Sequence, residues 1–200
     1  MRIAVDARPL ERERTGVGRY LEGLLGAWTL LHAADEVVLL SPRPVDLPDQ
    51  LAGKVTVRAG RSRLPGTLWL QAAAEHEARL EGCDLFFGSL SIVPVRSPLP
   101  AVATVHDLTP LLFPQWHSLK NRLGFVPFIG PTVHAARRIA CVSESTRRDL
   151  VARFPEAEGK SRVVPNGFVP PGPALAGPVD AGIPEPYVLF LGSRVPRKRT

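Results

Sequence analysis

The chain contains little cysteine. Only Cys83 and Cys141 occur among its 200 residues. Each stands at the start of an apolar run, which predicts two buried thiols in a reducing compartment. No cysteine and histidine stand at the spacing of a metal site, so no metal is expected. The sequence therefore favours neither a disulfide-stapled fold nor a zinc-bound one.

Long hydrophobic runs are also lacking. The longest candidate, residues 24–40, is interrupted by His32, Asp35 and Glu36, and it falls short of the roughly 20 apolar residues that cross a bilayer. The N-terminus enters an apolar run at once, so no signal peptide is expected. A series of aromatic residues for base stacking is missing too, which argues against a nucleic-acid partner. A cytoplasmic location is the expectation.

The composition is that of a globular protein. Hydrophobic residues make up 44% and charged residues 22%, and the formal net charge is +6. A mildly basic surface favours phosphorylated ligands, nucleic acid or anionic lipid headgroups without choosing among them. A simple bias of composition toward arginine explains the charge equally well.

Short apolar runs alternate with segments of helical periodicity. Continuous apolar runs predict strands buried on both faces, and alternation with helices predicts a parallel sheet. The fold class is therefore α/β, a Rossmann-like parallel sheet with helices on both faces. The expected strands are residues 2–7, 36–41, 54–58, 84–88, 101–107, 138–143 and 162–165; the expected helices are 16–31, 68–81, about 116–138 and 143–154.

The character of the sequence changes near its end. Residues 165–186 are rich in proline and glycine, which indicates an interdomain linker after a first domain over residues 1–164. Residues 187–200 read as one further strand and a basic loop. Because a lone strand cannot form a domain, we expect 187–200 to begin a truncated second domain.

Ligands of open α/β sheets bind at the carboxyl ends of the strands, so the residues there are the candidates for a site. Gly16 and Gly18 precede the first helix, where free N–H groups attract anions; a loop that needs a positive φ is the alternative. The pair is not the dinucleotide fingerprint GxGxxG, because its third glycine would fall at Leu21.

Two more strand ends carry polar groups. His106 follows an expected strand and could bind a sugar hydroxyl or a phosphate, or act as acid or base; a histidine bonded only to backbone is the alternative. Asp107 could cap the next turn or orient His106, and the prolines after it predict an extended loop. Ser143 is placed to cap a helix, and Ser145 is a ligand candidate only if it faces the cleft.

The last strand end is strongly basic. Arg194, Arg197, Lys198 and Arg199 follow the expected strand near the C-terminus. Arginine and lysine in such a turn can hold a diphosphate, although a solvated basic run or a nucleic-acid patch has the same composition.

Five motifs follow one another along nearly the whole chain. They are VDARPL…TGVGRY, VHDLTPLLFP, CVSESTRRDLVARFP, VVPNG and YVLFLGSRVPRK. In this order they resemble the GT-B glycosyltransferases of family 4, which include many mannosyl- and other hexosyltransferases. Five motifs in the right order make the resemblance fairly specific.

The resemblance implies transfer of a hexose with retention of configuration from a nucleotide-diphosphate sugar. The acceptor would be a glycan or a lipid-linked molecule. The resemblance also implies that the enzyme usually needs no bound metal or other cofactor. His106 would contact the transferred sugar, and Gly16 and Gly18 would lie by the donor phosphates or the acceptor entrance. Arg197 and Lys198 would hold the donor diphosphate.

Departures from the family pattern limit what is carried over. Ser193 replaces a common arginine or threonine, so the part played by Arg194 stays open. Phe87 stands where many relatives have a histidine, which puts part of the acceptor site in doubt. The family's paired glutamates would belong to the absent domain, so we expect this chain to be inactive alone.

Other functions remain open. A non-catalytic module that binds anionic ligands or glycans would share the architecture, and a nucleotide-dependent oxidoreductase is disfavoured by Leu21. Family members often use lipid-linked acceptors at the inner face of a membrane. A region of basic and aromatic residues that Pro127 and Pro131 interrupt makes a peripheral membrane contact a further hypothesis; its residues are Lys120, Arg122, Phe125 and Phe128.

Overall fold

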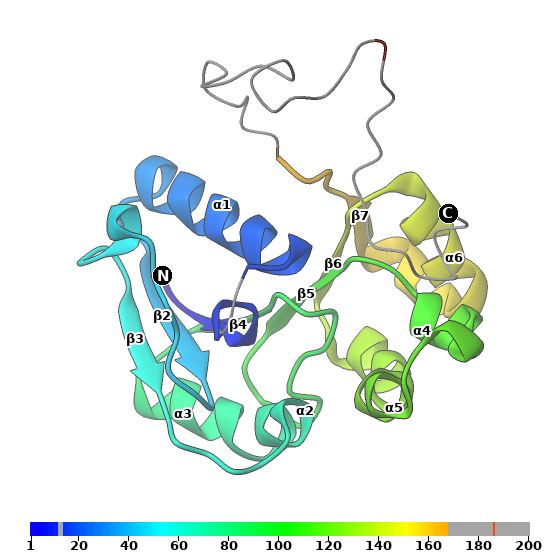
Figure 1. Cartoon of the computed structure of the whole chain (residues 1–200), viewed down its shortest axis with the longest axis horizontal. Helices are drawn as coiled ribbons and strands as arrows, with labels where there is room; N and C mark the ends of the chain where they lie inside the picture. Colours follow the sequence, from blue (N-terminus) through cyan, green and yellow to red (C-terminus); the bar gives the residue numbers. More distant parts are fainter. Residues whose placement is uncertain (12–13, 168–185, 187–200) are drawn as a thin grey trace. The chain divides into compact units, whose positions relative to one another are not determined.

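The computed structural model describes residues 1–11, 14–167 and 186. Met1–Gly167 form one compact unit built on a parallel sheet (Figure 1). Within these residues the sheet has seven strands in the order β3-β2-β1-β4-β5-β6-β7. Their bounds are β1 Arg2–Asp6, β2 Glu36–Ser41, β3 Thr56–Ala59, β4 Leu85–Gly88, β5 Ala101–Val105, β6 Arg138–Cys141 and β7 Ser161–Val163. The predicted Rossmann-like α/β sheet is confirmed.

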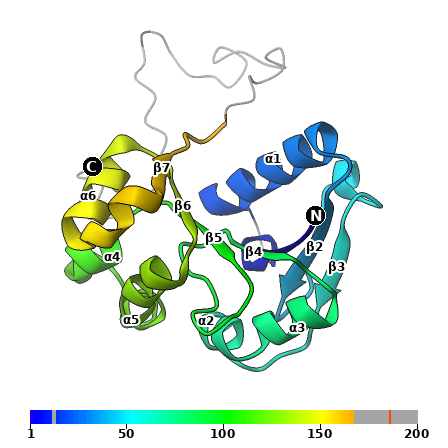
Figure 2. The same cartoon turned by 180° about the vertical axis from the view of Figure 1, so that it is seen from behind.

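Helices cover both faces of the sheet, as Figure 1 and its reverse view in Figure 2 show. The helix α1 lies on one face, whereas α2, α3, α5 and α6 belong to the core of the other. The helical bounds are α1 Gly16–Leu31, α2 Gly66–Trp69, α3 Glu75–Leu80, α4 Thr109–Leu112, α5 Leu119–Ala135 and α6 Glu144–Arg153.

The alternation of side chains along each strand divides the core in two. In β1, Ile3 and Val5 pack with Leu21 and Leu25 of α1, whereas Ala4 faces the core that contains Trp69. Successive side chains of a strand point to opposite faces, so one continuous apolar run supplies both cores. The apolar spacing of α1 places Leu21 and Leu25 on its buried face, as the sequence predicts.

Two local predictions need correction. The helix expected over 68–81 begins at Gly66 and contains a π-helical turn, η3 (Leu70–Ala74), between α2 and α3. The segment after Asp107 is not extended, because Pro110 lies in the first turn of α4. A proline fits there since the first helical N–H groups need no partner within the helix.

The domain boundaries remain a prediction. The compact unit described above ends at Gly167, and nearly all of the expected linker and the whole of 187–200 lie outside the described residues. Among the residues that are described, no helix combines the length and the apolar character that a membrane span requires.

Candidate functional site

The chain reverses its direction of growth between β1 and β4. From β1 it adds β2 and β3 on one side, and it then returns to add β4 to β7 on the other. In open α/β sheets this switch point opens a crevice at the carboxyl ends of the strands. The residues that follow β1, β4 and β5 therefore form the candidate site.

Asp6 and Arg8 form a buried ion pair at the end of β1. The Arg8 Nε donates to Asp6 Oδ1 at 2.8 Å and its Nη2 donates to Oδ2 at 2.7 Å. Asp6 is fully buried and the Arg8 side chain is 10% exposed. Burial opposes the charge of Arg8, but the attraction and hydrogen bonds of Asp6 outweigh it and raise the pKa of the guanidinium. The pair fixes the chain as it leaves the sheet.

His106 directly follows β5 and is half-buried. Its Nε2 lies 2.9 Å from the carbonyl oxygen of Ser89. Because a carbonyl only accepts, we assign the hydrogen to Nε2, and Nδ1 is then an acceptor. Nδ1 makes no hydrogen bond to any residue that the structure describes. The imidazole is thus a fixed ring with one acceptor still available.

The backbone of His106 is held from both sides. Its N–H donates to the Ser91 hydroxyl at 3.3 Å, and its carbonyl accepts from the Thr146 hydroxyl of α6 at 3.2 Å. Ser91 has a φ of 65°, a conformation that a serine adopts at a cost. Such strain persists only where the surroundings impose it, so the turn around His106 is specified by its contacts.

The turn after β4 carries the groups that position His106. The Ser89 hydroxyl donates to the carbonyl of Asp6 at 2.6 Å and so ties β4 to β1 across the switch point. A Cβ on Gly88 would lie 2.6 Å from the carbonyl oxygen of Ile92. Only glycine permits this close approach of the backbone.

Tyr20 connects the first helix to the same histidine. Its ring meets that of His106 edge to face, with centroids 4.9 Å apart. The hydroxyls of Tyr20 and Thr104 share a hydrogen bond of 3.1 Å. Burial raises the pKa of Tyr20 more than this hydrogen bond lowers it. The start of α1 is therefore locked to the end of β5.

The two glycines of α1 have different surroundings. Neither Gly16 nor Gly18 has a positive φ. The alternative interpretation, in which the glycines serve a loop that needs a positive φ, is therefore wrong. A Cβ on Gly18 would lie 2.9 Å from the carbonyl oxygen of Pro9, whereas a Cβ on Gly16 would meet nothing within 4 Å. Gly18 thus permits close packing, and Gly16 is exposed at a helix start whose N-cap, Thr15, makes no side-chain cap.

Asp107 caps the following turn rather than orienting His106. Its Oδ1 accepts from the N–H and the hydroxyl of Thr109, at 2.9 and 2.7 Å. The Thr109 hydroxyl also lies 2.9 Å from Nε2 of His117. Asp107 therefore shapes the loop between β5 and α5, beside the candidate site.

The remaining predicted residues divide into capping, exposed and undescribed ones. Ser143 caps α6, since its hydroxyl accepts from the N–H of Thr146 at 3.1 Å. Ser145 is exposed, and no contact ties it to His106. Arg194, Arg197 and Lys198 lie outside the described residues, so the donor-phosphate assignment stays a prediction.

The structure adds residues that the sequence did not single out. Asp6 and Ser89 lie at the carboxyl ends of strands. The expectation that ligands bind at these ends, which singled out His106, therefore applies to them as well. Arg8 and Tyr20 carry no such signal, since their roles depend on contacts across the fold. Phe87 packs edge to face on Trp28 and belongs to the core beneath α1.

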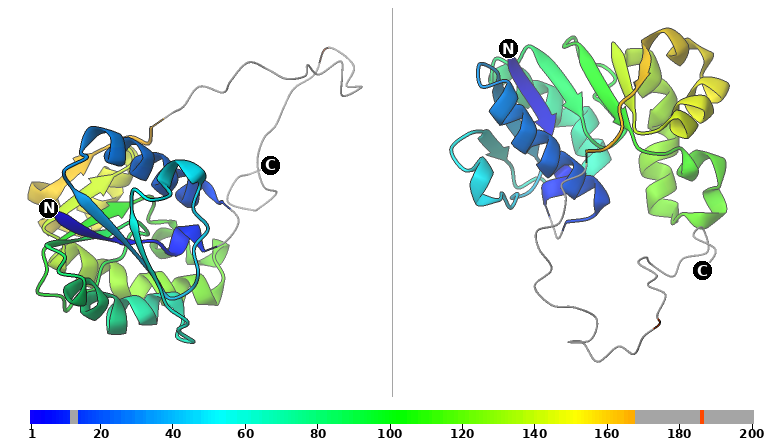
Figure 3. Two further views of the ribbon diagram at one scale, coloured as in Figure 1. Left: turned by 90° about the vertical axis from the view of Figure 1, so that its left-hand side faces the viewer. Right: turned by 90° about the horizontal axis from the view of Figure 1, so that it is seen from above.

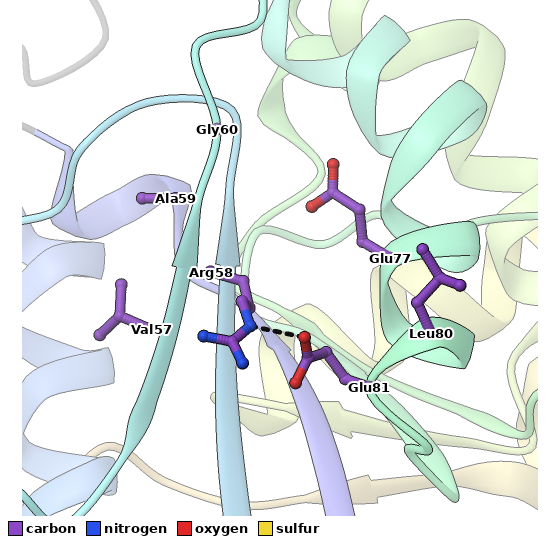
Figure 4. Close-up of a pocket in the computed structure, with 7 residues that line it drawn as sticks. All are labelled: Val57, Arg58, Ala59, Gly60, Glu77, Leu80 and Glu81. Carbon is purple, nitrogen blue, oxygen red and sulfur yellow. Dashed lines mark hydrogen bonds and ion pairs between the residues drawn. The ribbon is translucent and has the colours of Figure 1, made fainter.

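A separate pocket of about 430 Å³ lies away from this site, between β3 and α3 (Figure 4). It contains an ion pair in which Arg58 Nε donates to Glu81 Oε1. Burial raises the pKa of Glu77, partly offset by the indole N–H of Trp69. None of the predicted site residues lines this pocket.

The part of the chain that the structure describes contains no cluster of potential metal ligands. No three His, Cys, Asp or Glu side chains gather there in an arrangement that could hold a metal ion. The expectation of no cofactor is untested and stays a prediction.

The chain is similar to a protein-family model and to solved structures. No curated protein matches the sequence. Among solved structures, the UDP-N-acetylglucosamine 2-epimerase from Rickettsia bellii is similar to 82% of this chain, with 13% identity and a TM-score of 0.46. The chain spans 44% of that protein. The model of the family described as Glycosyltransferase Family 4 matches residues 14–170. The chain belongs to Glycosyltransferase Family 4.

Proposed function

We propose that this chain is the acceptor-side half of a GT-B glycosyltransferase that transfers a hexose, such as mannose, with retention of configuration. The donor is a nucleotide-diphosphate sugar, and the acceptor is a glycan or a lipid-linked molecule. Family membership supports glycosyl transfer in general. The arrangement around His106 carries the finer proposal.

His106 is suited to hold a sugar. Its Nε2–H is fixed by the Ser89 carbonyl, so the free acceptor Nδ1 can receive a hydrogen bond from a hydroxyl group of the transferred hexose. The ring is held by Tyr20, and its backbone by Thr146. A side chain positioned before the substrate arrives loses little entropy on binding, which favours accurate placement of the sugar.

The start of α1 is one candidate for contact with the donor diphosphate. The exposed N–H groups around Gly16 suit an anion, and Gly18 allows α1 to pack close to the chain that follows β1. We assign Arg197 and Lys198 to the diphosphate, where they would stabilise the negative charge that grows as the nucleotide departs. On this proposal no bound metal takes part.

Transfer by the protein encoded by the complete reading frame tests the proposal. We expect turnover with one member of a panel of nucleotide sugars, and a loss of at least about 100-fold in kcat for His106→Ala. His134→Ala is the matched control, because His134 is exposed at the end of α5. Lys198→Ala should raise the KM for the donor.

Equal activity of His106→Ala and His134→Ala would refute the site assignment. The alternative function, a non-catalytic module for anionic ligands or glycans, predicts a different result in the same experiment. It predicts binding that weakens steeply with salt and no turnover with any nucleotide sugar.

A further inference from the structure

Arg8 keeps one nitrogen of its guanidinium free at the end of β1. It opens the short helical turn η1 (Arg8–Leu10), which follows β1 closely. Its Nε and Nη2 both donate to the Asp6 carboxylate. Nη1 makes no hydrogen bond or ion pair with any residue that the structure describes. Because a guanidinium carries five N–H donors, the two donors on Nη1 remain available.

This free nitrogen reaches solvent although the side chain around it is buried. The Arg8 side chain is only 10% exposed. Some side-chain atoms of the described residues are buried without a partner, on Arg2, Glu75 and Ser161, but Nη1 of Arg8 is not one of them. Since Nη1 has no partner and is not buried, the small exposed part of Arg8 includes it. The fold thus presents a charged nitrogen on a side chain that Asp6 holds in place.

Arg8 lies at the same switch point as His106. The strands β1, β4 and β5 are neighbours in the sheet, and the left view of Figure 3 shows η1 (blue) at the end of β1 opposite to the N-terminus. The Asp6 carbonyl accepts from Ser89, whose own carbonyl lies against the His106 ring. Two strand spacings, about 10 Å, separate β1 from β5. This spacing suits a residue that contacts the sugar next to the one held by His106.

The start of α2 leaves room beside Nη1. A Cβ on Gly66 would lie 3.3 Å from Nη1 of Arg8 and 3.2 Å from its Cδ, and no atom of Asp6 lies within 4 Å of that Cβ. A side chain at this position would therefore crowd the free nitrogen without contacting the carboxylate. Gly66 provides a way to obstruct Nη1 while Arg8 stays paired.

The charges around Nη1 favour a neutral ligand. Asp6 already balances the guanidinium, and Glu11 adds a negative charge. Burial opposes the charge of Arg8, but Asp6 and, to a smaller extent, Glu11 favour it and hold the pKa of Arg8 above its ordinary value. The same two acids would repel a phosphate or a carboxylate at Nη1. A hydroxyl or ring oxygen can accept from this charged donor without that repulsion.

We propose that Nη1 of Arg8 donates a hydrogen bond to a neutral oxygen of the acceptor, a hydroxyl or ring oxygen of its terminal sugar. Arg8 then selects acceptors that end in a neutral sugar over those that present a phosphate or a carboxylate at this point. This step rests on the proposed function, because only transfer makes the sugar an acceptor. Binding of a neutral sugar at Arg8 requires no turnover and can be tested separately.

Titration of the 200-residue chain tests the binding. The probes are methyl glycosides of common hexoses and, separately, inorganic phosphate. We expect a glycoside to shift the guanidinium ¹⁵N resonances of Arg8 in a saturable way, and phosphate to leave them in place. Gly66→Ala should abolish the shift, because its Cβ crowds Nη1. Gly23→Ala, at a helical glycine whose Cβ would meet nothing within 4 Å, is the matched control and should retain it.

Kinetics of the protein encoded by the complete reading frame test the selection of the acceptor. Arg8→Lys keeps a cation for Asp6 but lacks the second arm of the guanidinium. We expect it to raise the KM for the acceptor by about ten-fold or more, and to change the KM for the nucleotide sugar less. Arg58→Lys is the matched control, because Arg58 also pairs with an acid, Glu81, away from this site. Its KM for the acceptor should equal that of the unchanged protein.

Several outcomes would overturn the proposal. They are a phosphate shift at Arg8 as large as that of the glycosides, no shift with any glycoside, equal shifts in Gly66→Ala and Gly23→Ala, and an unchanged KM for the acceptor in Arg8→Lys. A saturable glycoside shift in a protein that transfers no sugar would refute the proposed function alone.

Discussion

The ring edge of Tyr20 and the imidazole of His106 meet at a centroid distance of 4.9 Å and an interplanar angle of 83°. Tyr20 belongs to the first turns of α1, and His106 follows β5, so this contact joins the two elements that we assign to donor and sugar. Edge-to-face pairs of this kind contribute about 0.5–1.5 kcal/mol beyond the area they bury. The contact therefore restrains the orientation of His106.

Loss of the Tyr20 ring should release the histidine. We expect Tyr20→Ala to shift the side-chain ¹⁵N resonances of His106 toward those of a mixture of tautomers. Tyr20→Phe keeps the ring and should leave these resonances in place. Tyr20→Phe should lower the free energy of unfolding by about 1 kcal/mol, because it removes the hydrogen bond to Thr104. Unchanged resonances in Tyr20→Ala would show that Ser89 alone positions the ring.

Alanine at the two glycines of α1 should have opposite effects. Gly18→Ala should lower the free energy of unfolding by about 1–3 kcal/mol, because its Cβ would lie 2.9 Å from the Pro9 carbonyl oxygen. Gly16→Ala meets no neighbour and should be neutral or stabilise by up to about 1 kcal/mol. Urea unfolding measures both. A destabilised Gly16→Ala would contradict the open surroundings described for that residue.

Replacing only one partner of the buried ion pair between Asp6 and Arg8 should strongly lower the free energy of unfolding. Arg8→Met leaves the Asp6 carboxylate buried without a cation, and we expect a loss of about 3–5 kcal/mol in the free energy of unfolding. Adding Asp6→Leu to Arg8→Met should recover part of the lost stability, since no unpaired buried charge then remains. The pair of Arg79 and Glu75, in which the arginine side chain is 61% exposed, supplies the control, and Arg79→Met should cost less than about 1 kcal/mol.

Much of the fold could be predicted from the sequence because periodicity and burial agree. The apolar spacing of residues 16–31 predicts α1 with its observed bounds. Short apolar runs, together with the alternating pattern of residues 54–58, predict each of the seven strands to within a few residues. Pro110 misled the prediction, since a proline breaks the interior of a helix but fits its first turn. The π-helical turn within 66–80 has no pattern of its own.

Only part of the site could be predicted. His106 follows from its place at a strand end, but the group that fixes its tautomer is the backbone carbonyl of Ser89, 17 residues earlier. A backbone contact leaves no trace in residue identity. The same holds for Tyr20, whose contacts with Thr104 and His106 join positions that are 84 and 86 residues away in sequence.

Cys141 should make stability depend on pH in the alkaline range. Burial raises the pKa of its thiol to about 11, from an ordinary value near 9. The folded state therefore holds the proton more firmly than the unfolded state, so this contribution is complete below about 9 and is lost as the pH rises toward 11. Urea unfolding across this range should show a steeper loss in the unchanged chain than in Cys141→Ala. Parallel curves would mean that the thiol ionises normally in the fold.

Two serines at the start of α6 offer a test of the cap. The Ser143 hydroxyl accepts from the N–H of Thr146 at 3.1 Å, and Thr146 in turn holds the carbonyl of His106. We expect Ser143→Ala to lower the free energy of unfolding by about 1 kcal/mol. Ser145→Ala, two residues on at an exposed position, should change it by less than about 0.5 kcal/mol. Because the cap also orients Thr146, Ser143→Ala should shift the backbone amide resonances of His106 as well. Equal stability of the two variants would show that α6 starts without help from Ser143, and that the carbonyl of His106 is held by other means.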